Sequence, residues 1–135
     1  MKLLSTIPPF SNIEAVNNRP FSIGKLREQC VTVFYFWSQD CSLCKSMPTY
    51  LQRIIDRFGS QVQCIVVHDG PLVKKEFPKV EGAVLLIDNR QQLGDLFQLK
   101  QVPAVFLFDQ QQQLRFKQTG AADLHLLLRR IERFL

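Results

Sequence analysis

The sequence lacks long hydrophobic runs and contains few residues of several informative types. Its 135 residues include four cysteines, two histidines and one tryptophan. No stretch approaches the roughly 18 apolar residues that a membrane-spanning helix requires. Residues Met1–Pro9 imitate the start of a signal peptide, but the apolar part is too short and prolines interrupt it. We therefore expect a cytoplasmic protein with no membrane partner.

Charge of one sign is not concentrated along the chain either. The 17 Lys and Arg residues exceed the 12 Asp and Glu residues only modestly, which gives a net charge of +5. The one basic cluster, Arg129, Arg130 and Arg133, lies in an expected C-terminal helix, where positive charge complements the helix dipole. We therefore expect no nucleic-acid partner. The length suits one domain over residues 1–135, and we expect a monomer.

The segment around Cys41-Ser42-Leu43-Cys44 organises the chain. Before it, the β-branched and aromatic run Val31–Trp37 predicts a strand buried on both faces. After it, apolar residues recur at helical spacing, at Leu43, Met47, Leu51, Ile54, Ile55 and Phe58. We therefore expect both cysteines at a helix N-terminus, where unpaired N–H groups and the helix dipole favour a thiolate.

A Cys-X-X-Cys pair in that position is a candidate redox centre. Such thiols titrate at about 3.5 to 7.5, below the value of about 8.5 for a free thiol. We expect Cys41 to be the exposed nucleophile and Cys44 the covered thiol that resolves a mixed disulfide. A zinc site is the alternative, but it needs a second ligand pair. The other candidate ligands occur singly, at Cys30, Cys64, His68 and His125, so we expect no metal, and Cys30 and Cys64 as inert buried residues.

The remaining pattern predicts an α/β fold with a central mixed sheet flanked by helices. Strands are expected at Val62–Val67, Val84–Asp88, Ala104–Phe108 and Leu114–Gln118. Helices are expected at Ile23–Glu28, Leu72–Phe77, Gln91–Leu99 with Asn89-Arg90 as its cap, and Ala121–Phe134. Strand, helix and strand around the cysteines form a βαβ unit with parallel strands. Residues 1–29 precede this unit as a short N-terminal extension.

Several of these features together resemble the thioredoxin superfamily. They are Phe36-Trp37, the Cys-X-X-Cys motif followed by Lys45, a proline in the next helix, and Val102-Pro103 before a strand. The extension with its Pro20-Phe21 pair is similar to the TlpA-like and ResA-like branch, and most of the chain resembles small cytosolic thiol-disulfide oxidoreductases. The resemblance implies a thioredoxin-like fold and a cis Pro103 that faces the dithiol.

The resemblance also implies an activity. A cytosolic member would reduce protein disulfides, contribute to cell redox homeostasis, and need no cofactor beyond the Cys41–Cys44 dithiol. Its partners would be a disulfide-containing protein and an upstream thiol or flavoprotein reductant. Trp37, Leu43, Val102 and Pro103 would contact the substrate. Two alternatives stay open: a thiol peroxidase that uses Cys41, although the threonine of peroxiredoxins is replaced by Ser38, and a non-catalytic binding module.

The sequence departs from the family pattern at two positions. Pro48 comes seven residues after Cys41 instead of the usual eight, so we expect a different helix start or a kink. Tyr35 occupies the position of a buried aspartate, and a phenol of pKa near 10 is unsuited to accept a proton. Asp40, Lys45 and His68 are the remaining candidates for proton transfer or pKa tuning, although His68 also suits a simple turn. Asp40 is expected to raise the pKa of the Cys41 thiol, which would favour the disulfide and make the dithiol a reductant.

Overall fold

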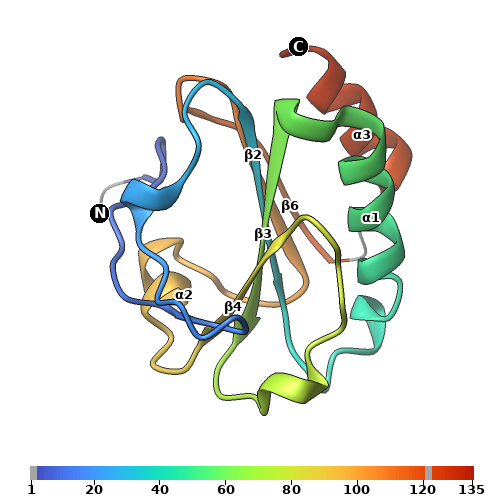
Figure 1. Cartoon of the computed structure of the whole chain (residues 1–135). Helices are drawn as coiled ribbons and strands as arrows, with labels where there is room; N and C mark the ends of the chain where they lie inside the picture. The colour runs from blue at the N-terminus through green and yellow to red at the C-terminus, as the bar shows by residue number, and fades with distance from the viewer. Residues whose placement is uncertain (1–2, 121–122) are drawn as a thin grey trace.

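One six-stranded mixed sheet forms the centre of the molecule in the computed structural model, which describes residues 3–120 and 123–135 (Figure 1). Its strands are β1 (Glu14–Ala15), β2 (Val31–Trp37), β3 (Val62–Asp69), β4 (Val84–Asp88), β5 (Ala104–Phe108) and β6 (Leu114–Thr119). They lie in the order β1-β4-β3-β2-β5-β6. Strands β2, β3 and β4 are parallel, and β1, β5 and β6 pair antiparallel with their neighbours. This confirms the α/β fold expected from the sequence.

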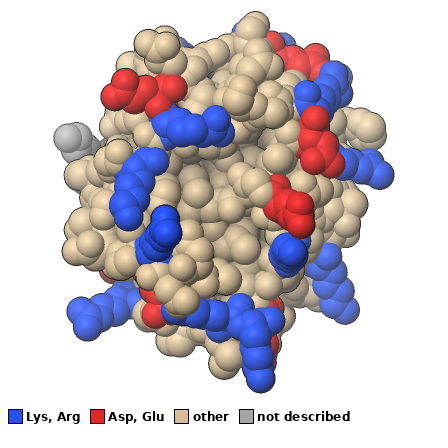
Figure 2. Space-filling model, in the orientation of Figure 1, with Lys and Arg blue, Asp and Glu red and all other residues tan. Residues whose placement is uncertain are grey.

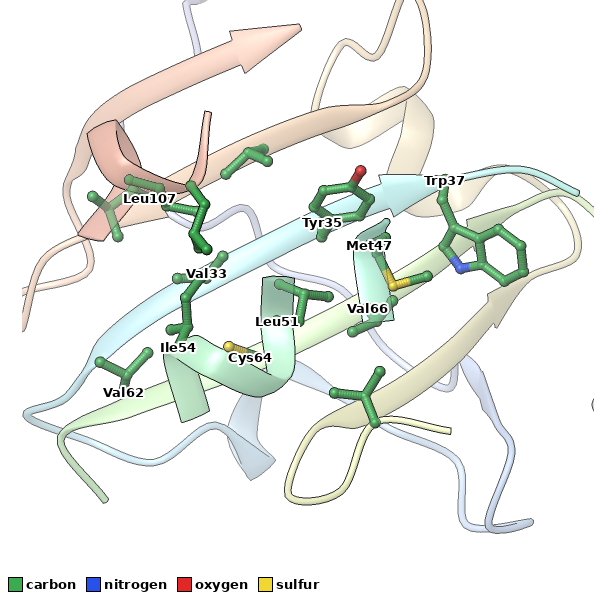
Figure 3. Close-up of a cluster of buried hydrophobic side chains, with 14 of the residues drawn as sticks. Val33, Tyr35, Trp37, Met47, Leu51, Ile54, Val62, Cys64, Val66 and Leu107 are labelled. Carbon is green, nitrogen blue, oxygen red and sulfur yellow. The ribbon is translucent and has the colours of Figure 1, made fainter. Parts of the chain in front are cut away.

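Helices cover both faces of the sheet. Helices α1 (Met47–Phe58) and α3 (Leu124–Glu132) lie on one face, whereas α2 (Gln92–Leu96) and the N-terminal extension lie on the other (Figure 1). Because side chains alternate along a strand, β2 supplies both cores. Figure 3 shows Val33, Tyr35 and Trp37 with α1, whereas Phe34 and Phe36 belong to the opposite core. The prediction of a strand buried on both faces is therefore confirmed.

Aromatic packing holds α2 against the sheet. The Phe97 ring lies 4.8 Å from Phe34, 5.1 Å from Phe36 and 5.0 Å from Phe106, measured between centroids. Such tilted and edge-on pairs each add about 0.5 to 1.5 kcal/mol beyond the area they bury. The α2 segment is thus fixed by tertiary packing, although it is too short to be stable alone.

Four predicted helices differ from those in the structure. The expected helix at Gln91–Leu99 contracts to α2, and the segments expected at Ile23–Glu28 and Leu72–Phe77 are short 3₁₀ turns at Ile23–Lys25 and Lys74–Glu76. Helix α3 begins at Leu124 after its cap Asp123, and the expected start at Ala121 lies outside the described residues.

The prediction that Asn89-Arg90 caps α2 is wrong. The buried carboxylate of Asp88 accepts hydrogen bonds from the backbone N–H groups of Leu93, at 3.2 Å, and Gly94, at 2.9 Å. These two groups are among the first N–H groups of the helix, which have no partner within it. An aspartate at the end of the preceding strand therefore replaces the expected cap.

The N-terminal extension is an integral part of the domain. Ile13 and Phe21 exchange two backbone hydrogen bonds, of 2.9 and 2.8 Å, which close a small hairpin. Strand β1 then pairs with the outer edge of β4, and Ile7, Phe10 and Phe21 are buried in the α2-side core. The extension thus covers an edge of the sheet that would otherwise be open to pairing with other chains.

No helix in residues 3–120 and 123–135 combines the length and apolar character that a membrane span needs. On the face shown in Figure 2, Lys and Arg side chains are scattered, some inside the outline and some at its edge, and Asp and Glu side chains lie beside several of them.

Candidate functional site

The cysteine motif follows β2 at one end of the sheet, in the loop that leads to α1 (Figure 1). Cys41 caps a 3₁₀ turn at Ser42–Cys44, and α1 begins only at Met47. The prediction that both cysteines lie in the first turn of the long helix is therefore wrong.

Pro48 explains this difference. A continuous α-helix through the motif would need a hydrogen bond from the N–H of residue 48 to the carbonyl of Cys44, and proline has no N–H to donate. Proline is well accepted in the first turn of a helix, and Pro48 lies there in α1. The shortened spacing from Cys41 to Pro48 thus separates the motif from the α-helix without introducing a kink.

Cys41 and Cys44 are joined by a disulfide, with Cα atoms 5.4 Å apart. This separation is within the usual range for disulfides, about 4.4 to 6.8 Å. Cys44 is 4% exposed and belongs to the same buried cluster as Trp37 and Met47. Cys41 is partly exposed and packs against the rim of that cluster. The two cysteines therefore differ in exposure in the order expected from the sequence.

Three hydrogen bonds hold the loop before Cys41. The N–H of Cys41 donates to the carbonyl of Ser38 at 3.2 Å, which closes a tight turn. Within that turn, the backbone N–H of Gln39 donates to Nε2 of His68 at 3.0 Å. The Gln39 side chain also donates to the carboxylate of Glu76, in the 3₁₀ turn that follows β3. The loop is thus attached to the next strand and to its following turn.

His68 is buried at the end of β3, with 4% of its surface exposed. Its Nδ1 lies 2.9 Å from the carbonyl oxygen of Gly70, so the ring contacts a backbone group through each nitrogen. The ring also stands edge-on to Trp37, with centroids 4.7 Å apart. Because both nitrogens are already bonded, this arrangement favours a positioning role over the proton transfer that the sequence suggested.

The residues expected to contact substrate occupy different environments. Leu43 is 57% exposed, whereas Trp37 is 5% exposed and packs between His68 and Phe77. Trp37 Nε1 is buried, and no described residue accepts a hydrogen bond from it. Trp37 therefore lies beneath the motif, and Leu43 lies at the surface.

The Val102–Pro103 peptide bond is cis, as the resemblance implied. Pro103 is buried and Val102 is partly exposed. Strand β5 begins directly after them, with Ala104 opposite Phe36 of β2. The proline segment therefore lies at the end of the sheet where β2 leads into the cysteine loop.

The described residues offer no buried acid beside Cys44. Burial, together with the neighbouring Tyr50, raises the pKa of Tyr35 to about 12, so this phenol is even less suited to accept a proton than an ordinary tyrosine. The buried acids are Asp88, which caps α2 on the other face, and Asp109, which follows the far end of β5. Asp40 and Lys45 are both exposed on either side of the motif.

The sequence reasoning missed Gln39 and Glu76. Both are polar residues in loops, and no periodicity or spacing marks them. The available signal was topological: each follows the carboxyl end of one of two parallel strands, and these ends meet at one edge of the sheet.

The other two cysteines are buried and free. Burial raises the pKa of Cys64 to about 12 despite the nearby Arg27, and it raises the pKa of Cys30 in the same way. The raised pKa values favour the protonated form of both thiols.

Across residues 3–120 and 123–135, no three His, Cys, Asp or Glu side chains are grouped as a metal would require.

Comparison with known proteins places this architecture. The sequence model of the TraF family, described as F plasmid transfer operon protein, matches residues 14–131. The thiol-disulfide oxidoreductase YkuV of Bacillus subtilis is 27% identical over 100% of this chain and 97% of its own length. The solution structure of a thioredoxin-like protein in its oxidised form is 26% identical, with a TM-score of 0.76 over 99% of this chain and 97% of that one.

A third comparison concerns the fold alone. A crystal structure from Chlorobium tepidum, named as a thiol:disulfide interchange protein DsbE, has a TM-score of 0.83 over 98% of this chain and 97% of that one, at 16% identity. With a sheet of thioredoxin-like topology and a Cys41–Cys44 disulfide in the loop after β2, the chain belongs to the TraF family of the thioredoxin-like superfamily and to the thiol-disulfide oxidoreductase class.

Proposed function

We propose that the protein reduces disulfide bonds in other proteins by exchange at Cys41. The observation that carries this proposal is the unequal exposure of the two linked cysteines. Cys41 is partly exposed, whereas Cys44 is 4% exposed and lies in the core. An ordered two-step exchange requires a nucleophile that the substrate can reach and a second thiol that it cannot reach.

The exchange begins when the Cys41 thiolate attacks one sulfur of the substrate disulfide. A mixed disulfide forms, and the other substrate sulfur leaves as a thiolate that takes a proton from water. Cys44, once deprotonated, attacks the Cys41 sulfur and forms the Cys41–Cys44 disulfide, and the second substrate sulfur leaves. The substrate gains two electrons and two protons, and the protein loses them. We propose an upstream thiol or flavoprotein reductant that returns them.

The proton of Cys44 goes to water or to a leaving thiolate in this scheme. Tyr35 stays protonated because its pKa is about 12, and the two buried acids lie away from the motif. Asp40 is exposed next to Cys41, and its negative charge opposes the neighbouring thiolate. This charge favours the disulfide over the dithiol and therefore favours reduction of the substrate.

Substrate contacts are proposed at the surface formed by Leu43 and the Val102–Pro103 segment. Leu43 offers an exposed apolar side chain between the cysteines, and the partly exposed Val102 offers its backbone. Trp37 is too deeply buried to form much of this surface, so we assign it to support of the motif from below.

We also propose that this reaction takes place in the cytoplasm, where thiols are kept reduced and a dithiol acts mainly as a reductant. Trapping the thiols in living cells by rapid alkylation measures the redox state of Cys41. A mainly reduced pair supports this location, and a mainly oxidised pair contradicts it.

The function is tested by trapping the mixed disulfide. With disulfide-bonded insulin as the substrate and dithiothreitol as the electron donor, the wild type should accelerate disulfide reduction, and Cys41→Ser should abolish this acceleration. Cys44→Ser, first reduced and then freed of dithiothreitol, should accumulate a mixed disulfide with the substrate at Cys41, which mass spectrometry identifies. The matched control is Cys30→Ser, which removes a thiol outside the motif and should retain activity. Full activity of Cys41→Ser would contradict the proposal, and peroxide consumption without disulfide reduction would favour the peroxidase alternative.

A further inference from the structure

We propose that His68 is a positioning residue that holds the loop carrying Cys41 while the dithiol is reduced. The inference deepens the proposed function and depends on it, because it concerns the state in which the Cys41–Cys44 disulfide is open. The two hydrogen bonds of the His68 ring go to the backbone of Gln39 and Gly70, and neither goes to a sulfur of Cys41 or Cys44. It acts through the backbone of Gln39, two residues before Cys41.

The hydrogen bonds of His68 specify one form of the ring. A neutral imidazole has one N–H donor and one acceptor nitrogen. The backbone N–H of Gln39 needs an acceptor at Nε2, and the carbonyl of Gly70 needs a donor at Nδ1. Only the neutral ring with its hydrogen on Nδ1 satisfies both partners. Each partner belongs to a different loop, so the ring joins the loop before Cys41 to the turn after β3.

The ring is itself immobilised, which makes it a useful point of attachment. It is 4% exposed and stands edge-on to Trp37, at 4.7 Å and 81°. Trp37 in turn packs against Phe77, with centroids 5.1 Å apart. His68 also lies directly opposite Trp37 in the pairing of β3 with β2. The loop is therefore bonded to a group fixed by the sheet and by two aromatic rings.

This attachment and the disulfide restrain the same loop, so each favours the other. In the disulfide form, the covalent bond to Cys44 restrains Cys41 directly, and the His68 bond forms without further ordering of the loop. When the disulfide opens, the hydrogen bonds from Cys41 N–H to Ser38, from Gln39 N–H to His68 and from the Gln39 side chain to Glu76 remain to restrain the loop. Without the His68 bond the reduced loop can leave this arrangement, so the loss should destabilise the disulfide more than the dithiol. It should also slow attack by Cys41, because a mobile nucleophile spends less time in a reactive geometry.

The test uses three variants and one equilibrium. His68→Leu removes both ring hydrogen bonds and leaves an apolar side chain. His68→Gln keeps one acceptor and one donor on a side chain of similar reach. Gln52→Ala is the matched control, because it removes the side-chain hydrogen bonds of a glutamine that contacts Glu81 and not the cysteine loop. The equilibrium constant between dithiol and disulfide is measured against a glutathione series by acid quenching, alkylation and mass spectrometry.

We expect His68→Leu to shift this equilibrium about tenfold toward the dithiol, since the net value of one such hydrogen bond is a factor of this order. A tenfold shift corresponds to a reduction potential about 30 mV less negative. His68→Gln should reverse most of the shift, and Gln52→Ala should stay within about twofold of the wild type. A shift below twofold for His68→Leu, with equal loss of unfolding free energy in both redox states, would show a purely structural role and overturn the inference.

A measurement on the unmodified protein covers the case in which a variant does not fold. In the reduced wild type, nitrogen NMR should show hydrogen on Nδ1 of His68, and the Gln39 amide should exchange slowly with solvent. A hydrogen on Nε2, or Gln39 exchange at the rate of a free amide, contradicts the inference. Absence of any redox transition in the wild type would instead contradict the proposed function, so the two failures are distinguishable.

Discussion

The four cysteines should react with an alkylating reagent in an order set by burial and thiolate content. The perturbation is complete reduction of the native protein followed by a short exposure to iodoacetamide at pH 8. Cys41 is the one motif thiol that is partly exposed, and Cys44, Cys30 and Cys64 are buried. Because the thiolate is the reacting species, Cys41 should be modified first.

The structure sets the size of the difference for Cys64. Its pKa of about 12 compares with the ordinary value of 9.0. At pH 8, a thiol of pKa 12 is about one part in ten thousand thiolate, and a thiol of pKa 9 is about one part in ten. Reaction at Cys64 should therefore be about a thousandfold slower than at an ordinary thiol, before its 1% exposure is considered.

Peptide mapping after timed quenching measures the four rates. A parallel sample in guanidinium chloride provides the control, because unfolding should make all four cysteines react at similar rates. Modification of Cys64 or Cys30 in the native protein as fast as Cys41 would refute both the assigned burial and the choice of nucleophile.

Three further predictions concern charge, acid stability and packing. Asp40→Asn should raise the alkylation rate of Cys41 in the native protein by about twofold to fivefold at low salt, because an exposed charge has a modest effect. In 1 M salt, which screens this charge, the substitution should change the rate little. Asp95→Asn, at another exposed position, is the control, and an unchanged rate at low salt for Asp40→Asn would contradict the role of Asp40. Burial opposes ionisation of Asp109, but hydrogen bonds from the N–H groups of Gln113 and Gln111 and from Arg115 outweigh it and lower its pKa. The ionised group therefore stabilises the fold above about pH 4, and this contribution is lost as pH falls through the lower folded pKa. Asp109→Asn should cost about 1.5 to 3 kcal/mol at pH 7 and less near pH 2, and a constant difference in urea unfolding across that range would contradict this. Leu51→Ala should lower the free energy of unfolding by about 2 to 5 kcal/mol, because Leu51 is 1% exposed, whereas Thr49→Ala on the exposed side of α1 should change it little.

The sequence predicted the central strands well because their boundaries are marked by residues with strong local preferences. Strands β4 and β5 have the predicted bounds, Val84–Asp88 and Ala104–Phe108. Pro103 has no N–H to donate to a neighbouring strand, so β5 begins only after it. The apolar run then continues to Phe108. The same local signals marked Cys41 and Cys44, since the motif needs only a strand before it and a helix after it.

Features that depend on contacts between distant segments could not be predicted in this way. The cap of α2 comes from Asp88, at the end of the previous strand, and a sequence pattern does not show which polar residue will reach the helix. The bond between His68 and Gln39 depends on the pairing of β2 with β3, which brings two unremarkable loops together. The delayed start of α1 followed from a local cause, the missing N–H of Pro48, but only the structure shows that the motif forms a separate 3₁₀ turn.

The central claim is that Cys41 and Cys44 form one reversible redox pair that serves as a reductant. The most direct test is the equilibrium of this pair across a series of glutathione and dithiothreitol buffers. Fluorescence of Trp37, which lies in the same buried cluster as Cys44, reports the state, and Cys44→Ser is the control. The account predicts a single two-electron transition well below the potential of the glutathione pool, absent in the control. A midpoint well above that potential, or no transition at all, would contradict it.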